Sequence, residues 1–169
     1  MKNIITLAII IFLSLTPAFS KQISVENLEK IFKKSLPECK EIVYTKVPRG
    51  LIISVDEKIF FEECETEIKE DSYFILDILA EIIRELPNRF IIEDHIRYGC
   101  SGKLEPWEIS MVRSSNLSEY FIKYKRLSNE QIFDIGFGEL MPFKDNVTGA
   151  AAPLDNRVDF IIIEYEIKR

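Results

Sequence analysis

The residues of this 169-residue chain that could do chemistry are few and widely spaced. There is one histidine, His95, and there are three cysteines, Cys39, Cys64 and Cys100. The sequence contains no G-x-S-x-G motif, no H-E-x-x-H motif and no P-loop. Acidic residues are abundant, but no pair of them is singled out as the acid and base of a hydrolase. The sequence therefore predicts a protein that is not an enzyme.

The cysteines are open to two interpretations. Their spacing matches no zinc-binding pattern, and a lone histidine makes a metal site less favourable still, so neither a metal nor a cofactor is predicted. In an oxidising compartment, two of Cys39, Cys64 and Cys100 can form a disulfide and leave one thiol over, in a pairing that the sequence does not determine. The alternative is three small buried side chains. His95 is expected to pack at the end of a strand.

The N-terminus has the layout of a secretory signal peptide. Met1–Asn3 carries a positive charge, Ile4–Leu15 is an apolar run, and Ala18–Ser20 offers small residues before a cut after Ser20. A retained membrane anchor is the alternative, but the run is shorter than the roughly 20 residues of a spanning helix and ends at Pro17. No cysteine lies at the cut, so nothing indicates a lipid anchor. We expect residues 1–20 to be removed and the mature protein to be exported without a transmembrane segment.

Composition and charge indicate which kinds of partner the protein can bind. The chain is 47% apolar and 30% charged, as in ordinary globular proteins, and the residues after the predicted cut suffice for one domain. The formal net charge is −6, which argues against nucleic acid or anionic lipid as the main partner. A polymer that carries amines is compatible with this charge.

Hydrophobic periodicity predicts strands that alternate with helices. Leu79 lies in the middle of the apolar stripe of the first long helix, with Ile75 and Ile82 one turn to either side. The predicted order is strand, helix, strand, helix, strand, long loop, strand. The expected strands are Leu51–Val55, Arg89–Ile96, Gln131–Phe137 and Val158–Tyr165, and the expected helices are Thr66–Leu86 and Trp107–Tyr124.

We therefore predict an α+β fold, with a mixed sheet of about four strands and two main helices on one of its faces. Ahead of it, Ser24–Leu36 reads as a short helix that Ser24 can cap, and Glu41–Val47 as an extended piece. Pro48–Gly50 is a turn signal, which we take as a domain border. The predicted division is a signal peptide over 1–20, an N-terminal helix and extended segment over 21–50, and the main domain over 51–169.

Four motifs lie on these elements. Gly136–Pro142 (GFGELMP) matches G-[YF]-G-E-x-x-P, and Asp145–Phe160 is similar to N-x-T-x-x-G-R-A-x-N-R-R-V-E-[IF]. Trp107–Leu117 is similar to W-[ED]-L-S-x-x-R-A-x-x-V, and Ile91–Ile96 to I-x-I-E-G-H-T-D. In these motifs, and in their order, the stretch Leu51–Tyr165 resembles the OmpA-like domain family. That family includes the C-terminal domains of outer-membrane protein A, of the peptidoglycan-associated lipoprotein and of the flagellar stator protein MotB.

The resemblance implies a site for the diaminopimelate residue of the peptidoglycan stem peptide. The family's arginine, which can grip a carboxylate bidentately, corresponds to Arg113. The family's aspartate, which pairs with the ligand amine, aligns with Arg97, or with Tyr98 if the alignment is shifted by one residue. Neither residue is acidic, so the acid that would pair with the ligand amine is missing. Ser110 and Arg157 match other fixed motif positions and complete the candidate ligand-binding residues.

Each candidate has a structural alternative. Arg113 could be an ordinary surface arginine. Arg97 and Tyr98 could form a differently charged pocket or merely cap a strand. Arg157 could form an ion pair with a loop carboxylate instead of contacting a ligand. Gly136 and Gly138 are expected to serve backbone geometry and not phosphate binding.

Together these features predict a structural protein of the cell envelope, located in the periplasm or at the outer membrane and anchored non-covalently to peptidoglycan. The alternative is a domain that has lost its ligand and acts as a protein-interaction subunit of an envelope or secretion assembly. Arg113 and the intact GFGELMP motif favour the first function, and the missing acid favours the second. The expected partners are the peptidoglycan stem peptide and other envelope proteins, and not nucleic acid.

Overall fold

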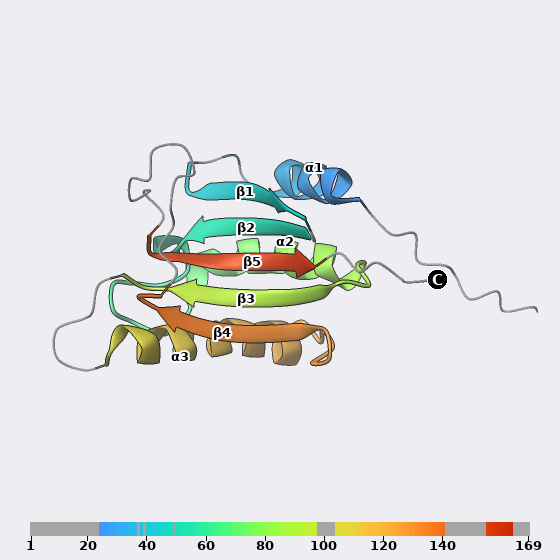
Figure 1. Ribbon diagram of the computed structural model, residues 1–169. Coiled ribbons are helices and arrows are strands. Elements are labelled where there is room, and N and C mark those ends of the chain that lie inside the picture. Colours follow the sequence, from blue (N-terminus) through green and yellow to red (C-terminus); the bar gives the residue numbers. More distant parts are fainter. Residues whose placement is uncertain are drawn as a thin grey trace, which may run out of the picture.

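A single mixed sheet forms the centre of the protein (Figure 1). The computed structural model describes residues 24–36, 38, 40–48, 50–97, 104–140 and 155–163. The strands lie in the order β1-β2-β5-β3-β4, and all neighbours are antiparallel except β3 and β4, which are parallel. Their bounds are β1 Ile42–Val47, β2 Gly50–Asp56, β3 Arg89–His95, β4 Ile132–Gly138 and β5 Arg157–Ile163.

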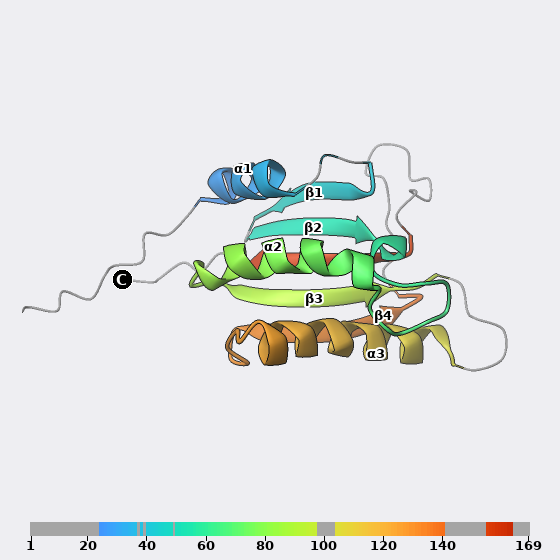
Figure 2. The same cartoon turned by 180° about the vertical axis from the view of Figure 1, so that it is seen from behind.

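Helices cover one face of this sheet. Seen from behind in Figure 2, α2 (Tyr73–Arg84) lies in front of the middle strands and α3 (Pro106–Glu119) in front of β4, both running roughly along the strands, and α1 (Val25–Ser35) lies at the β1 edge of the sheet. A π-helical turn, Tyr120–Tyr124, continues α3. Short 3-10 turns at Glu57–Ile59 and Glu70–Ser72 precede α2. The opposite face carries none of the described helices.

Phe160 of the central strand β5 anchors the core between sheet and helices. Its ring lies 5.6 Å from that of Phe60 and 5.7 Å from that of Phe90, measured between centroids, and Phe121 packs edge-on 6.3 Å away. Alternation along a strand places Phe160 on the helix side and its neighbour Asp159 on the other side. The apolar face of α2, with Leu79 at its centre, is fully buried against the same core.

The predicted α+β class, with helices on one face of a mixed sheet, is confirmed. The sheet has five strands, because β1 pairs with β2 along its whole length. Leu28 and Phe32 of α1 are also fully buried in the shared core, so residues on both sides of the predicted border at Gly50 pack together.

The predicted start of the first long helix was wrong by two helical turns. The helix expected from Thr66 begins at Tyr73, because the chain before it returns to the first 3-10 turn. The backbone N–H of Lys69 donates to the Phe60 carbonyl at 2.8 Å, and the Lys69 ammonium donates to the Lys58 carbonyl at 2.9 Å. The predicted signal peptide and the last residues of the predicted strand Val158–Tyr165 lie outside the described residues.

Candidate functional site

The candidate site lies where β2 and β3 end and β5 begins, beneath the N-terminal half of α3. Antiparallel pairing of β5 with both β2 and β3 brings these three strand ends to one edge of the sheet. Pro106 starts α3, and the Glu108 carboxylate accepts the free N–H of Glu105 at 2.8 Å, which satisfies a donor at the helix start. Ser110 and Arg113 of α3 lie above these strand ends.

Two glycines of the GFGELMP motif allow α3 to pack close to the sheet. A Cβ on Gly136 would lie 2.3 Å from the Met111 nitrogen, and one on Gly138 would lie 2.8 Å from Trp107 backbone atoms. Gly138 also has φ +55°, which favours glycine. Its N–H donates to the Ser110 hydroxyl at 2.8 Å. The prediction that these glycines serve backbone geometry is confirmed, and Ser110 ties α3 to β4.

Arg113 is buried, with 1% of its surface exposed, and its guanidinium is held on three sides. Nε donates to the Glu65 carbonyl at 2.7 Å, and one terminal nitrogen donates to the Glu62 carbonyl at 3.0 Å. The other terminal nitrogen forms a buried ion pair with the Glu57 carboxylate. The Phe61 ring lies 4.6 Å from the guanidinium carbon. Arg113 is therefore not a surface arginine: it organises the loop that follows β2.

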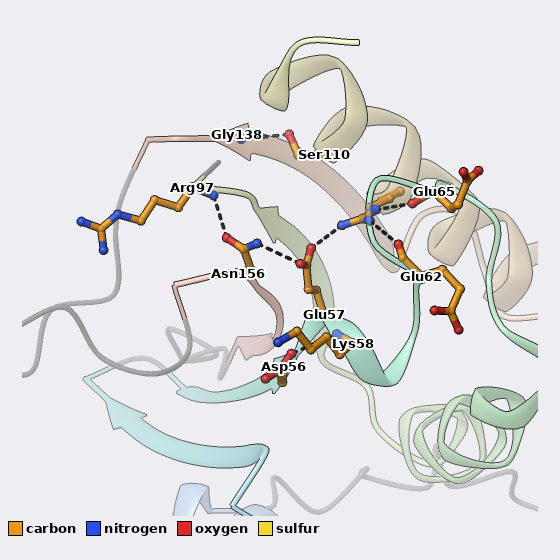
Figure 3. A network of polar contacts seen from close by, with 10 residues as sticks. Asp56, Glu57, Lys58, Glu62, Glu65, Arg97, Ser110, Gly138 and Asn156 are labelled. Atoms are coloured by element: carbon orange, nitrogen blue, oxygen red, sulfur yellow. Dashed lines mark hydrogen bonds and ion pairs between the residues drawn. The ribbon is translucent and has the colours of Figure 1, made fainter. Parts of the chain in front are cut away.

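Asn156 connects this ion pair to Arg97. Its amide nitrogen donates to the second Glu57 oxygen at 2.8 Å, and its amide oxygen accepts the Arg97 backbone N–H at 2.8 Å (Figure 3). The Arg97 side chain points away from Glu57 and forms an ion pair with Asp155. The two arginines are thus each matched with an acid, and Asn156 bridges them through Glu57.

Asp94 adds a buried acid beside this network. It is 0% exposed, and neither carboxyl oxygen has a hydrogen-bond partner within the described residues. Burial raises the pKa of Asp94 well above its usual range, against the opposing attraction of Arg113. Because the charged form would be costly here, the neutral acid is the form that this environment favours.

Arg157 lies on the other face of the sheet. Its Nε donates to Asp159 at 2.9 Å, and the His95 ring lies near the same carboxylate. Arg157 therefore forms an ion pair, but the partner Asp159 lies on β5, whereas the sequence interpretation placed the carboxylate in a loop. Burial lowers the pKa of His95, but the carboxylates of Asp159 and Glu93 outweigh it, so that the pKa is raised. His95 also stacks on Phe137, as expected of a residue packed at a strand end.

The sequence-predicted ligand residues are therefore only partly brought together. Arg113 and Arg97 share one network, Ser110 serves the contact between α3 and β4, and Arg157 faces away. Whether any of them binds a ligand stays a prediction, and Tyr98 lies outside the described residues.

Cys64 is disulfide-bonded and has φ +62°. Cys39 and Cys100 lie outside the described residues, so the pairing also stays a prediction.

Glu57 and Asn156 connect the network and Asp94 is buried beside it, yet the motifs do not indicate these roles. The alternation of side chains along β3 indicates that Asp94 is buried, since it lies on the same face as Phe90 and Ile92. No local signal connects Glu57 with Arg113, 56 residues apart.

No family model matches this sequence. The uncharacterized protein YtxE of Bacillus subtilis (strain 168) is 25% identical over 122 residues, which cover 68% of this chain and 48% of that protein. The chain thus spans about half the length of this curated relative. Within the described residues, no helix is long and apolar enough to cross a membrane.

Solved structures resemble the fold closely. The cell wall anchor of the type VI secretion system (T6SS) of Pseudomonas aeruginosa superimposes with a TM-score of 0.70 at 10% identity, covering 84% of this chain and all of that one. A putative MotB-like protein from Desulfovibrio vulgaris gives 0.72 at 19% identity, covering 86% and 91%. The OmpA-like domain of FopA1 from Francisella tularensis gives 0.50 at 16%, covering 74% and 83%. The predicted resemblance is confirmed at the level of the fold.

Proposed function

We propose that this chain, which has the OmpA-like fold, is a non-enzymatic structural protein of the bacterial envelope that associates non-covalently with peptidoglycan. The observation that carries the proposal is the likeness of its fold to a cell wall anchor over 84% of this chain, together with an arginine held at the matching motif position of α3. Export by the predicted signal peptide and a periplasmic or outer-membrane location belong to the same proposal.

The structure indicates how a ligand carboxylate would be bound. A guanidinium has five N–H donors, and the bonds to Glu57, Glu62 and Glu65 use three of those on Arg113. The Glu57 carboxylate occupies one edge of the guanidinium, where a ligand carboxylate would compete with it. Wall association through Arg113 therefore requires the Glu57 side chain to turn aside, which we expect to weaken binding.

The amine of a diaminopimelate residue meets a less favourable partner. The position of the family's aspartate holds Arg97, whose charge is matched by Asp155. A ligand ammonium would be repelled by Arg97 unless Asp155 turned toward it. We therefore propose that recognition rests on the carboxylate and that free diaminopimelate binds poorly.

Calorimetry with a soluble stem peptide that contains diaminopimelate tests this proposal. Arg97→Asp removes the repelling charge and leaves Asp155 without its cation, so affinity should rise above that of the wild type. Arg113→Ala should abolish whatever binding exists, provided that circular dichroism shows a folded protein. Tight wild-type binding that survives Arg113→Ala would show that the ligand binds elsewhere.

A second candidate function is supported by a different observation. Large apolar side chains are exposed along the outer side of α3 and the end of β4, at Trp107 (53%), Met111 (49%) and Leu140 (69%). Such a surface suits contact with another protein of an envelope or secretion assembly. Failure to bind wall fragments, together with loss of a partner on Trp107→Ala and Met111→Ala, would favour this second function.

A further inference from the structure

Three potential metal ligands gather on the sheet face opposite to the core. Glu93 and Asp159 are directly paired across β3 and β5, and His95 lies two residues after Glu93 on the same face. One ligand atom from each lies within 4.8 Å of the others. His95 and Asp159 are buried, while the Glu93 side chain keeps 17% exposure and leaves an approach from solvent.

The spacing of the ligand atoms differs from that of hydrogen bonds. His95 Nε2 lies 3.4 Å from an Asp159 oxygen and 3.5 Å from a Glu93 oxygen. Charge-assisted N–H···O bonds are shorter, at about 2.7–2.9 Å, and Nε2 is a buried atom with no hydrogen-bond partner within the described residues. Ligand atoms about 2.1 Å from a tetrahedral Zn²⁺ lie about 3.4 Å apart, which matches both distances.

The imidazole is oriented for coordination. Its ring stacks on Phe137, with centroids 5.0 Å apart and planes 1° apart, which fixes the ring plane. Nδ1 lies 3.4 Å from the Leu140 carbonyl, and in the tautomer that carries its proton on Nδ1 the Nε2 lone pair would face the two carboxylates. Histidines that bind metals commonly donate their second ring N–H to a carbonyl in this way.

The local charge also favours a cation. Glu93 and Asp159 contribute two negative charges, and Arg157, bonded to Asp159 Oδ2 at 2.9 Å, offsets one of them. The oxygen that lies 3.4 Å from His95 Nε2 is the same Asp159 Oδ2, which accepts from Arg157 and keeps a second lone pair for a metal, while Oδ1 is buried without a hydrogen-bond partner within the described residues. With Arg157 beside Asp159, one of the two carboxylate charges is left for a bound cation to offset.

We propose that Glu93, His95 and Asp159 form a binding site for Zn²⁺, with one carboxylate oxygen from each acid, His95 Nε2 and a water as ligands. The bound metal links β3 to β5. Through the contacts of His95 with Phe137 and Leu140, it also fixes the end of β4. No sequence motif indicates this site, because its ligands lie on strands separated by more than 60 residues and match no Cys/His spacing.

Zinc titration of metal-free protein, prepared without a histidine tag, tests the proposal. Calorimetry should show one Zn²⁺ per chain, and Co²⁺ should give the intense visible absorption of a tetrahedral complex. His95 is the sole histidine, so its imidazole resonances report directly on coordination: ¹⁵N NMR should show Nε2 bound to metal and Nδ1 protonated.

Variants separate this site from other modes of binding. Glu93→Gln, an isosteric change of a side chain that keeps 17% exposure, should weaken Zn²⁺ affinity at least about tenfold, and His95→Gln should abolish it. Asp134→Asn, an exposed acid on β4, is the matched control and should leave affinity unchanged. Zn²⁺ binding that is unaffected by Glu93→Gln would overturn the proposal. So would a His95 ring that stays doubly protonated and unperturbed by Zn²⁺, since the cluster would then be an internal ion pair.

Discussion

Replacing Arg113 with methionine should destabilise the protein more than any exposed arginine can. Methionine keeps much of the apolar stem but removes the partner of the buried Glu57 carboxylate and of the Glu62 and Glu65 carbonyls. Removing one member of a buried ion pair typically costs 3–5 kcal/mol, because the other charge is left unmatched. We expect about 3–5 kcal/mol of unfolding free energy to be lost.

Urea unfolding followed by far-ultraviolet circular dichroism measures this loss. Arg84→Met is the matched control: Arg84 is a partly exposed helix residue that pairs with Glu81, and its loss should cost less than about 1 kcal/mol. Adding Glu57→Gln to Arg113→Met should recover part of the stability, because no charge is then left buried. A loss under about 1 kcal/mol for Arg113→Met would refute the structural role assigned to Arg113.

Three further predictions concern stability. Leu79→Ala should lower the free energy of unfolding by about 2–5 kcal/mol, since Leu79 is fully buried; a loss under about 0.5 kcal/mol in urea unfolding would contradict this packing. Because burial raises the pKa of Asp94, the stability that its neutral form provides is present at low pH and lost as the pH rises through the folded-state pKa. Asp94→Asn should therefore unfold at a higher temperature than the wild type near neutral pH, and the advantage should shrink on acidification; a constant difference would argue against a raised pKa. Gly136→Ala should cost about 1–3 kcal/mol or more, as its Cβ would meet Met111 backbone, and an unchanged melting temperature would show that α3 can move away.

Much of the fold could be predicted from periodicity. The stripe around Leu79 identified α2, and alternation identified the strands, because both patterns record which face is buried. The start of α2 could not be predicted, since Lys69 bonds back to the preceding turn and the Thr66 carbonyl accepts from Asn116 of α3, contacts that local propensity does not encode.

The site was less predictable, for a physical reason. Motif similarity located Arg113 but not its burial, although it lies four residues from both Ile109 and Leu117 on the inward face of α3. A lone arginine on an apolar face is buried only when an acid meets it there. That acid, Glu57, comes from a distant turn, and sequence spacing alone does not place it beside Arg113.

Co-sedimentation of the purified protein with insoluble peptidoglycan sacculi tests the central claim most directly. The account predicts that a fraction of the wild-type protein pellets with the sacculi, that a carboxylate-blocked wall preparation retains less, and that Arg97→Asp retains more. A wild-type protein that stays in the supernatant at every sacculus concentration, while the Arg97→Asp variant does the same, would contradict wall association.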